Sequence, residues 1–244
     1  MFKIAVQLYS LREQLKAETL DNALRKVAEA GYDGVETWSF DGLTAPELKE
    51  KLNKAALSCP SMHVSLELLY GDLDKVISDA LTLGASFIVI PWSRAETEAD
   101  VQEIIDFARQ NAPKLRENGL RLLYHNHWQE FKPIDNGRNF FDLLLENTDN
   151  SQINLQADVL WVKEAGPPIA AFISKVKERL GGFHLKDHCE VGAGSIDFGV
   201  ILKAARELGQ EWLIVEQEEF DIDPYESIRI SLENIREIEK GNDL

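Results

Sequence analysis

Cysteine is scarce in this chain, whose 244 residues include only Cys59 and Cys189. The two are far apart and neither belongs to a CxxC pair, so the sequence offers no disulfide framework and no cysteine-based zinc motif. We interpret both as packing residues. So little cysteine is typical of a reducing compartment, and we predict a cytoplasmic location.

Long apolar runs are also missing, and basic residues are outnumbered by acidic ones. The first segment, MFKIAVQLYSLREQ, has an apolar run that Gln7 interrupts at once, so it predicts neither a signal peptide nor a membrane span. Lys and Arg number 26 against 42 Asp and Glu, which gives a formal charge of −16. Because no basic face is evident, this charge argues against nucleic acids and anionic membranes as partners.

Proline and glycine do not gather into linkers. The eight prolines and fifteen glycines are spread along the chain, so we predict a single domain over residues 1–244. Glycine marks a recurring junction in which an amphipathic stretch, a glycine and a short apolar run follow one another. A glycine just past a helix can take the left-handed conformation that closes the last turn, so each junction predicts a helix, a cap and a strand. The segments with this pattern are AEAGYDGVETW, LTLGASFIVIPW, RENGLRLLYHNH, ERLGGFHLKDH and RELGQEWLIVEQ.

Eight short apolar segments alternate with amphipathic ones. Several strand candidates, such as SFIVI and WLIV, are continuously apolar, as parallel strands covered on both sides are. The intervening segments have the helical period, and Thr44 and Asp223 precede sequences typical of helix starts. The alternation predicts a parallel sheet, and eight units without a GxGxxG after the first strand favour a closed (β/α)₈ TIM barrel over an open sheet. The predicted strands are residues 3–9, 33–38, 60–66, 86–92, 120–127, 153–159, 182–187 and 212–217.

Polar residues follow the apolar part of nearly every predicted strand. In a barrel of this kind, the active site lies at the carboxyl ends of the strands. We therefore expect these side chains to line one mouth. They are Gln7, Tyr9, Glu36, Trp38, His63, Trp92, His125, His127, Asp158, His184, Lys186 and Glu216.

The last four strands each contribute a potential metal ligand. Because side chains alternate along a strand, His125 shares a face with His127, and His184 shares one with Lys186. Imidazole and carboxylate groups together suit Mn²⁺, Co²⁺, Zn²⁺ or Mg²⁺. The predicted ligands are His125, Asp158, His184 and Glu216.

Each of these residues also has a structural interpretation. A histidine at a strand end can simply hydrogen-bond to a neighbouring loop. Asp158 can cap the helix that follows it, and Glu216 can pair with Lys186.

Several segments resemble the sugar phosphate isomerase/epimerase family, whose members are xylose-isomerase-like barrels. The resemblance extends over nearly the whole chain and rests on YHNHWQEF (124–131), LQADVLWV (155–162), FHLKDH (183–188) with VGAGSIDF (191–198), IVEQEEF (214–220), GYDGVETW (31–38) and SMHVSLE (61–67).

The resemblance implies one divalent metal held by a Glu, an Asp, a His and a Glu from strands five to eight. Asp158, His184 and Glu216 match the last three positions. The chain departs from the family at strand five, where His125 stands in place of the usual Glu and Glu130 is an alternative ligand or base. It departs again at Trp161, where the family often has a histidine.

The resemblance further implies an isomerase or epimerase that removes a proton next to a carbonyl through a metal-stabilised enediolate. Glu216 is the first candidate for the base, with Glu130 and His127 as rivals, and Lys186 would hold a substrate oxygen. Lys186 is the only evident cation nearby, so we expect a neutral keto sugar or a cyclitol rather than a sugar phosphate. The candidate substrate contacts are Glu36, His63, Trp92, His127, Trp161 and Lys186.

Three other functions fit part of the pattern. A lyase or dehydratase acting on a keto sugar or inosose would use the same intermediate. A metal-free, non-catalytic sugar-binding barrel is favoured only by His125, and an abasic-site endonuclease is disfavoured by the negative charge and by Trp161. The sequence leaves the oligomeric state open, and it is compatible with a homo-oligomer.

Overall fold

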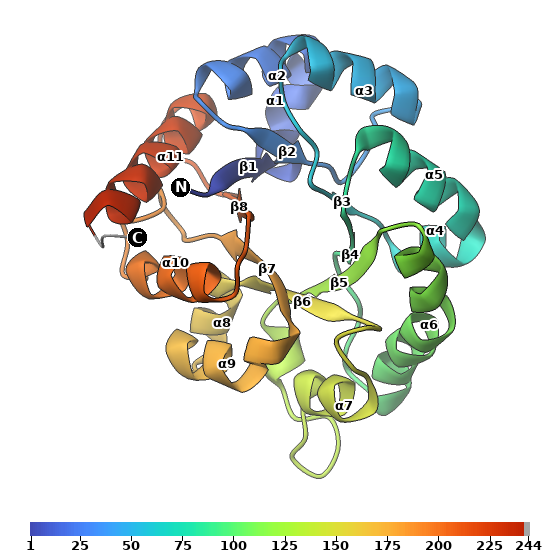
Figure 1. Cartoon of the computed structure of the whole chain (residues 1–244). Coiled ribbons are helices and arrows are strands. Elements are labelled where there is room, and N and C mark those ends of the chain that lie inside the picture. The colour runs from blue at the N-terminus through green and yellow to red at the C-terminus, as the bar shows by residue number, and fades with distance from the viewer. Residues whose placement is uncertain (242–244) are drawn as a thin grey trace.

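The computed structural model describes residues 1–241. Figure 1 looks along a barrel of parallel strands that is surrounded by a ring of helices. The predicted single TIM barrel is confirmed. Within the described residues, no helix is long and apolar enough to cross a membrane.

The strands form one eight-stranded sheet in the order β2-β1-β8-β7-β6-β5-β4-β3. Its two end strands, β2 and β3, are joined by isolated bridges that pair Thr37 with Met62 and Gly34 with Ser58, and these nearly close the barrel. The strands are β1 (Lys3–Gln7), β2 (Gly34–Glu36), β3 (Ser61–His63), β4 (Phe87–Ile90), β5 (Arg121–His125), β6 (Asn154–Asp158), β7 (Leu180–Leu185) and β8 (Trp212–Val215).

The helices pack outside the sheet, and the longer ones each bury one apolar face. In α6, for example, Val101, Ile104, Ile105 and Ala108 are buried, as their spacing predicts. The helices are η1 (Leu8–Leu11), α1 (Arg12–Ala17), α2 (Leu20–Glu29), α3 (Ala45–Lys54), α4 (Leu66–Gly71), α5 (Leu73–Leu83), α6 (Glu98–Glu117), η2 (Gln129–Phe131), α7 (Phe140–Asn147), α8 (Val159–Ala165), α9 (Ile169–Val176), η3 (Lys177–Arg179), α10 (Phe198–Glu207) and α11 (Pro224–Gly241).

All eight predicted strands are present, but each ends earlier than expected. After β1 and β6 the chain leaves the sheet because a helix begins at once. Leu8 begins η1 directly after β1, and Asp158 ends β6 by capping α8 through its side chain. The mouth is therefore built from residues at the junction of strand and loop.

Four of the five predicted glycine caps are confirmed, with φ of 99° at Gly31, 79° at Gly84, 74° at Gly119 and 66° at Gly209. The fifth prediction, at Gly181, is wrong because β7 already begins at Leu180. Gly181 instead allows close packing in the barrel, since an added Cβ would lie 2.3 Å from a methyl carbon of Leu123.

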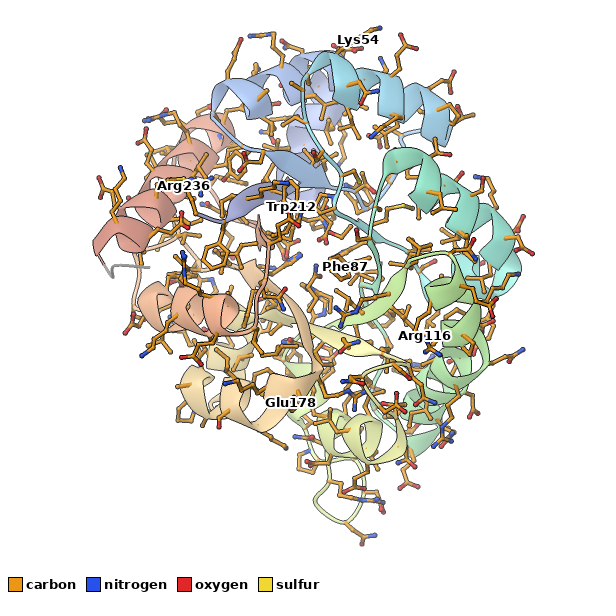
Figure 2. All side chains as sticks on the ribbon, viewed as in Figure 1. Lys54, Phe87, Arg116, Glu178, Trp212 and Arg236 are labelled. Carbon is orange, nitrogen blue, oxygen red and sulfur yellow. The ribbon has the colours of Figure 1, made fainter. Side chains whose placement is uncertain are left out.

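Side chains fill the interior of the barrel (Figure 2). Trp212 and Phe87, the first residues of β8 and β4, lie near the centre of the view. The interior is therefore a packed core and no open pore, as is usual for this architecture.

Candidate functional site

The last four strands bring four potential metal ligands together at one end of the barrel. His125 and Asp158 end β5 and β6, His184 lies in β7 beside Asp158, and Glu216 follows β8. Each offers one donor atom, and these atoms lie within 4.8 Å of one another. All four side chains are buried. We call these four residues the ligand cluster.

The chemistry of the ligand cluster fits a divalent cation. Two imidazoles and two carboxylates are ligands that Mn²⁺, Co²⁺ and Zn²⁺ accept. Asp158 Oδ1 accepts hydrogen bonds from the backbone N–H groups of Leu160 and Trp161 at 2.9 and 3.2 Å. Its Oδ2 is buried without a hydrogen-bond partner, and such an atom is costly unless something binds it. The cap and the ligand interpretations of Asp158 are thus compatible.

Glu36 forms a second layer directly behind the ligand cluster. It is fully buried at the end of β2. Its Oε1 lies 2.7 Å from His184 Nε2 and 2.9 Å from His63 Nε2. Burial opposes its ionisation, but the two histidines prevail and hold the pKa of Glu36 well below its usual value. Both of its oxygens are taken by protein groups, the remaining donors being Gln7, Ser61 and Gln156.

Lys186 places a positive charge against the ligand cluster. Its Nζ lies 3.2 Å from Glu216 Oε2 and 3.6 Å from Asp158 Oδ2, and it also pairs with Glu218. Burial opposes the charge of this ammonium group, but the carboxylates outweigh burial and raise the pKa of Lys186 above its usual value. The Glu216–Lys186 ion pair, one of the two interpretations of the sequence, is present.

The histidines differ in protonation because their neighbours differ. Burial opposes the protonation of His184, but Glu36 and Glu216 on its two sides raise its pKa to about 10. Burial, with His184 and His127 nearby, holds the pKa of His125 well below its usual value. Burial and the charge of Lys186 lower the pKa of His127 to about 4. His125 and His127 are therefore neutral near pH 7, the form of an imidazole that binds metal, whereas His184 would release a proton on binding a metal.

The carboxylates of the ligand cluster are also shifted in opposite directions. Burial raises the pKa of Asp158 to about 6, against the charge of Lys186. Burial opposes the ionisation of Glu216, yet Lys186 and His184 keep its pKa well below the usual value.

Glu130 does not join the ligand cluster. It lies in η2, accepts a hydrogen bond from the hydroxyl of Tyr124 at 2.7 Å and another from the backbone N–H of His127 at 2.9 Å. Tyr124 precedes His125 and so projects to the opposite face of β5. The structure thus places His125, and not Glu130, with the other three donors.

The tryptophans named from the sequence lie in different surroundings. Trp161 borders the ligand cluster, with its ring centroid 5.7 Å from that of His127 and 5.0 Å from Lys186 Nζ. Its buried Nε1 has no hydrogen-bond partner. Trp92 is 58% exposed and lines a separate hollow with Trp128, so the structure does not bring it to the cluster.

Sequence reasoning missed two residues of the site, Gln156 and Glu218. Gln156 Oε1 lies 3.0 Å from His63 Nε2 and 3.2 Å from His125 Nδ1, while its Nε2 donates to Glu36 at 2.7 Å. Strand alternation could have predicted it, since Gln156 is two residues before Asp158 and lies on the same strand face. Glu218 likewise stands two residues after Glu216.

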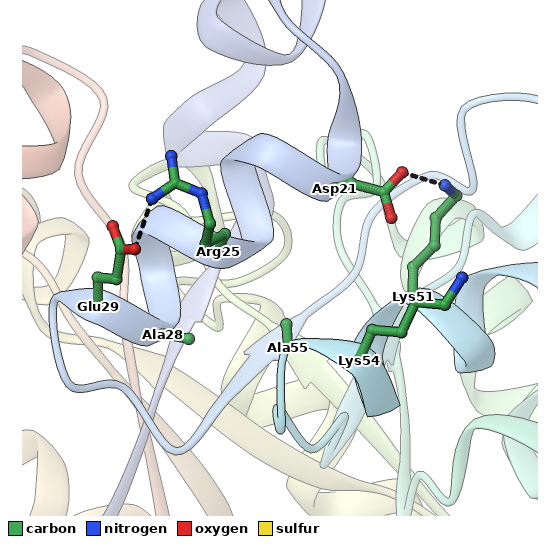
Figure 3. Close-up of a pocket in the computed structure, with 7 residues that line it drawn as sticks. All are labelled: Asp21, Arg25, Ala28, Glu29, Lys51, Lys54 and Ala55. Carbon is green, nitrogen blue, oxygen red and sulfur yellow. Dashed lines mark hydrogen bonds and ion pairs between the residues drawn. The ribbon is translucent and has the colours of Figure 1, made fainter.

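A groove on the outer helices is separate from this site. Figure 3 shows it between α2 and α3, where Asp21 pairs with Lys51 and Arg25 pairs with Glu29. None of its lining residues comes from a strand end, so it is not the candidate site.

Comparisons with known proteins agree with the fold. A family model described as a xylose isomerase-like TIM barrel matches residues 24–238. No match was found among curated protein sequences.

Several solved structures are similar to this chain. A sugar phosphate isomerase/epimerase from Parabacteroides distasonis is 24% identical, with a TM-score of 0.85 over 97% of this chain and 94% of that one. A 3-keto-D-glucoside 4-epimerase from E. coli is 15% identical, with a TM-score of 0.71 over 97% and 100%. A protein from Bacillus anthracis named as a probable 3-DHS dehydratase is 13% identical, with a TM-score of 0.71 over 96% and 98%. At these identities the likeness shows the shared fold.

Proposed function

The chain belongs to the xylose isomerase-like TIM barrel family, and we propose that it is a divalent-metal-dependent isomerase or epimerase of a neutral keto sugar or a cyclitol. The observation that carries the proposal is the ligand cluster, whose four buried donors lie within 4.8 Å of one another. The names of the similar structures, among them a sugar phosphate isomerase/epimerase and a 3-keto-D-glucoside 4-epimerase, support the reaction class.

His125, Asp158, His184 and Glu216 would hold the ion. When bound, it would supply Lewis-acid stabilisation of negative charge that develops on a substrate oxygen. Glu36 has no free oxygen. We therefore assign it the positioning of His184 and His63, and no direct contact with substrate.

Glu216 would carry out the proton transfer, with help from its neighbours. Glu216 lies at the mouth. Its Oε2 accepts a hydrogen bond from Lys186 Nζ and lies 3.2 Å from His184 Nδ1. It would remove the proton next to the carbonyl, and Lys186 would donate a hydrogen bond to the oxygen that gains charge. His127 and the ring of Trp161 border the same space and would contact the sugar. Glu130 would act only by fixing the turn after β5.

The charges at the mouth support a neutral substrate. The ammonium of Lys186 is already shared among Asp158, Glu216 and Glu218. It therefore carries no uncompensated charge with which to hold a phosphate.

The test combines metal analysis with solvent exchange. Protein purified without chelator and reloaded with Mn²⁺ should contain about one equivalent of metal per chain. Incubation with keto sugars and inososes in D₂O should introduce deuterium next to the carbonyl, as read by NMR. The Asp158→Asn variant keeps a side-chain oxygen for the α8 cap but loses the anionic ligand, so it should lose both metal and exchange.

Glu130→Gln is the matched control, because Glu130 is a buried carboxylate outside the ligand cluster. It should keep its metal. If wild-type protein binds no metal after reconstitution and Asp158→Asn binds sugar as the wild type does, the enzymatic proposal is wrong and a non-catalytic sugar-binding barrel takes its place.

A lyase or dehydratase is the second candidate. The neighbour named as a probable 3-DHS dehydratase favours it, and the same residues would remove the first proton. NMR separates the two, because an epimerase returns a product of the same composition and a dehydratase releases water.

A further inference from the structure

A second cavity adjoins the ligand cluster. It has a volume of about 570 Å³ and lies at the carboxyl ends of β2 and β3, against α4 and α5. This volume is within the range of small-molecule sites. Its walls are mostly apolar or aromatic and include Trp38, Phe40, Met62, Val64, Leu68 and Val76.

The cavity exists because the barrel has its weakest pairing here. β2 and β3 are three residues each and are joined only by isolated bridges, the last of them between Thr37 and Met62. Beyond that bridge the segment after β2 runs toward α3 and the segment after β3 runs toward α4. The cavity opens between them.

His63 connects the cavity to the ligand cluster. The residue lines the cavity, and its ring is stacked on that of His184 with centroids 5.4 Å apart. Its Nε2 is held 2.9 Å from Glu36. His63 is therefore the residue that the wall of the cavity shares with the surroundings of the ligand cluster, and a molecule spanning the two would pass this ring.

The chemistry of the cavity favours an apolar, uncharged group. Trp38 and Leu68 are 42% and 62% exposed, and a ligand that covered them would gain from the removal of apolar surface from water. Hydroxyl groups buried against such walls would lack partners. The rim carries Glu67 and Asp72, and its Lys75 is paired with Asp79, so an anion would be repelled.

We propose that this cavity is a subsite for the apolar aglycone, preferably aromatic, of a glycoside whose sugar ring lies at the ligand cluster. The inference rests on the proposed function, since the ligand cluster must take the sugar. It narrows the proposed substrate class from a neutral keto sugar or a cyclitol to a keto glycoside.

The test compares two matched ligands, phenyl and methyl 3-keto-β-D-glucopyranoside. Deuterium exchange in D₂O gives kcat/KM, and calorimetric titration gives Kd. The phenyl glycoside should be favoured on the order of tenfold in both. Leu68→Gln should remove most of this preference and leave kcat/KM and Kd for the methyl glycoside unchanged. Leu81→Gln is the control, because Leu81 is 50% exposed on α5 and does not line the cavity.

Two results would overturn the subsite. The first is that the wild type shows equal kcat/KM and equal Kd for the phenyl and methyl glycosides. The second is that Leu68→Gln and Leu81→Gln change the phenyl preference equally. If neither these glycosides nor the keto sugars and inososes exchange deuterium, the proposed function fails, whereas the subsite is still tested by Kd. A phenyl preference in Kd that Leu68→Gln removes would still support the subsite.

Discussion

Gln156 Oε1 lies 3.2 Å from Nδ1 of His125, and this contact selects the tautomer of the strand-five histidine. The amide nitrogen of Gln156 donates to Glu36, an ionised carboxylate that only accepts. The amide oxygen must therefore face His125 as an acceptor, so Nδ1 carries the proton. Nε2 is left with a free lone pair 3.8 Å from Asp158 Oδ2. A neutral imidazole thus faces Asp158 of the ligand cluster, at the position where the family resemblance implies a carboxylate.

Gln156→Leu should weaken metal binding through this contact. Loss of a partner behind a ligating histidine typically costs about 10- to 100-fold in metal affinity. We expect a decrease of that size in a titration with Mn²⁺ or Zn²⁺. Gln7→Leu is the control, since Gln7 also donates to Glu36 at 2.7 Å but does not contact His125. Equal losses of affinity in the two variants would show that the tautomer is not what matters.

Lys186→Met should make the protein depend on metal for stability. In the metal-free protein, this substitution removes the ammonium group next to Glu216 and Asp158 and leaves His184 as the one neighbouring cation among the described residues, and breaking a buried ion pair costs about 3–5 kcal/mol. We expect a lower Tm in chelator and a larger rise in Tm on adding Mn²⁺ than in the wild type, both read by scanning calorimetry. Lys163→Met removes a cation 3.6 Å from Asp187, outside the ligand cluster, and should not enlarge the rise. An unchanged metal response in Lys186→Met would contradict this account.

Gly34→Ala should destabilise the barrel at its β2–β3 seam. A Cβ at Gly34 would lie 2.6 Å from the backbone oxygen of Ser58 and 3.1 Å from the Trp212 ring, and overpacking of this kind costs about 1–3 kcal/mol. Urea denaturation should show a loss of this size. Gly182→Ala is the matched control within β7, where the nearest atom to an added Cβ is 3.7 Å away. Its stability should change much less, and similar losses in both variants would refute the steric explanation.

The two cysteines should differ in their reaction with a thiol reagent. Thiolate is the reactive form, and burial raises the pKa of Cys59 to about 12, so Cys59 should stay unmodified in the folded protein from pH 7 to 9. Cys189 is partly exposed, and its pKa is raised by burial and by Asp187 and Glu190. We expect one thiol to react slowly near pH 7 and faster as the pH rises, and the second to react only after unfolding. Mass spectrometry of the labelled peptides identifies the site, and early labelling of Cys59 would contradict its burial.

The order of the elements could be predicted because its causes are local. The alternation of apolar runs and amphipathic stretches, the glycines that end helices and the cap at Asp223 all act within a few residues. Strand periodicity also predicts correctly that His125 and His127 lie near each other, with ring centroids 5.0 Å apart. Gly181 was misread because a glycine that caps a helix and one that makes room for Leu123 have the same local sequence pattern.

The membership of the site was decided only by the closed barrel. Glu36 lies 148 residues from His184 in sequence, yet its Oε1 is 2.7 Å from His184 Nε2. That His125, and not Glu130, lies with the other three donors likewise depended on which side of β5 the following turn occupies. A sequence shows which residues share a face of one strand, because that follows from backbone geometry. Distances across the barrel interior depend on strand register and closure, which are set by the packing of all eight strands together.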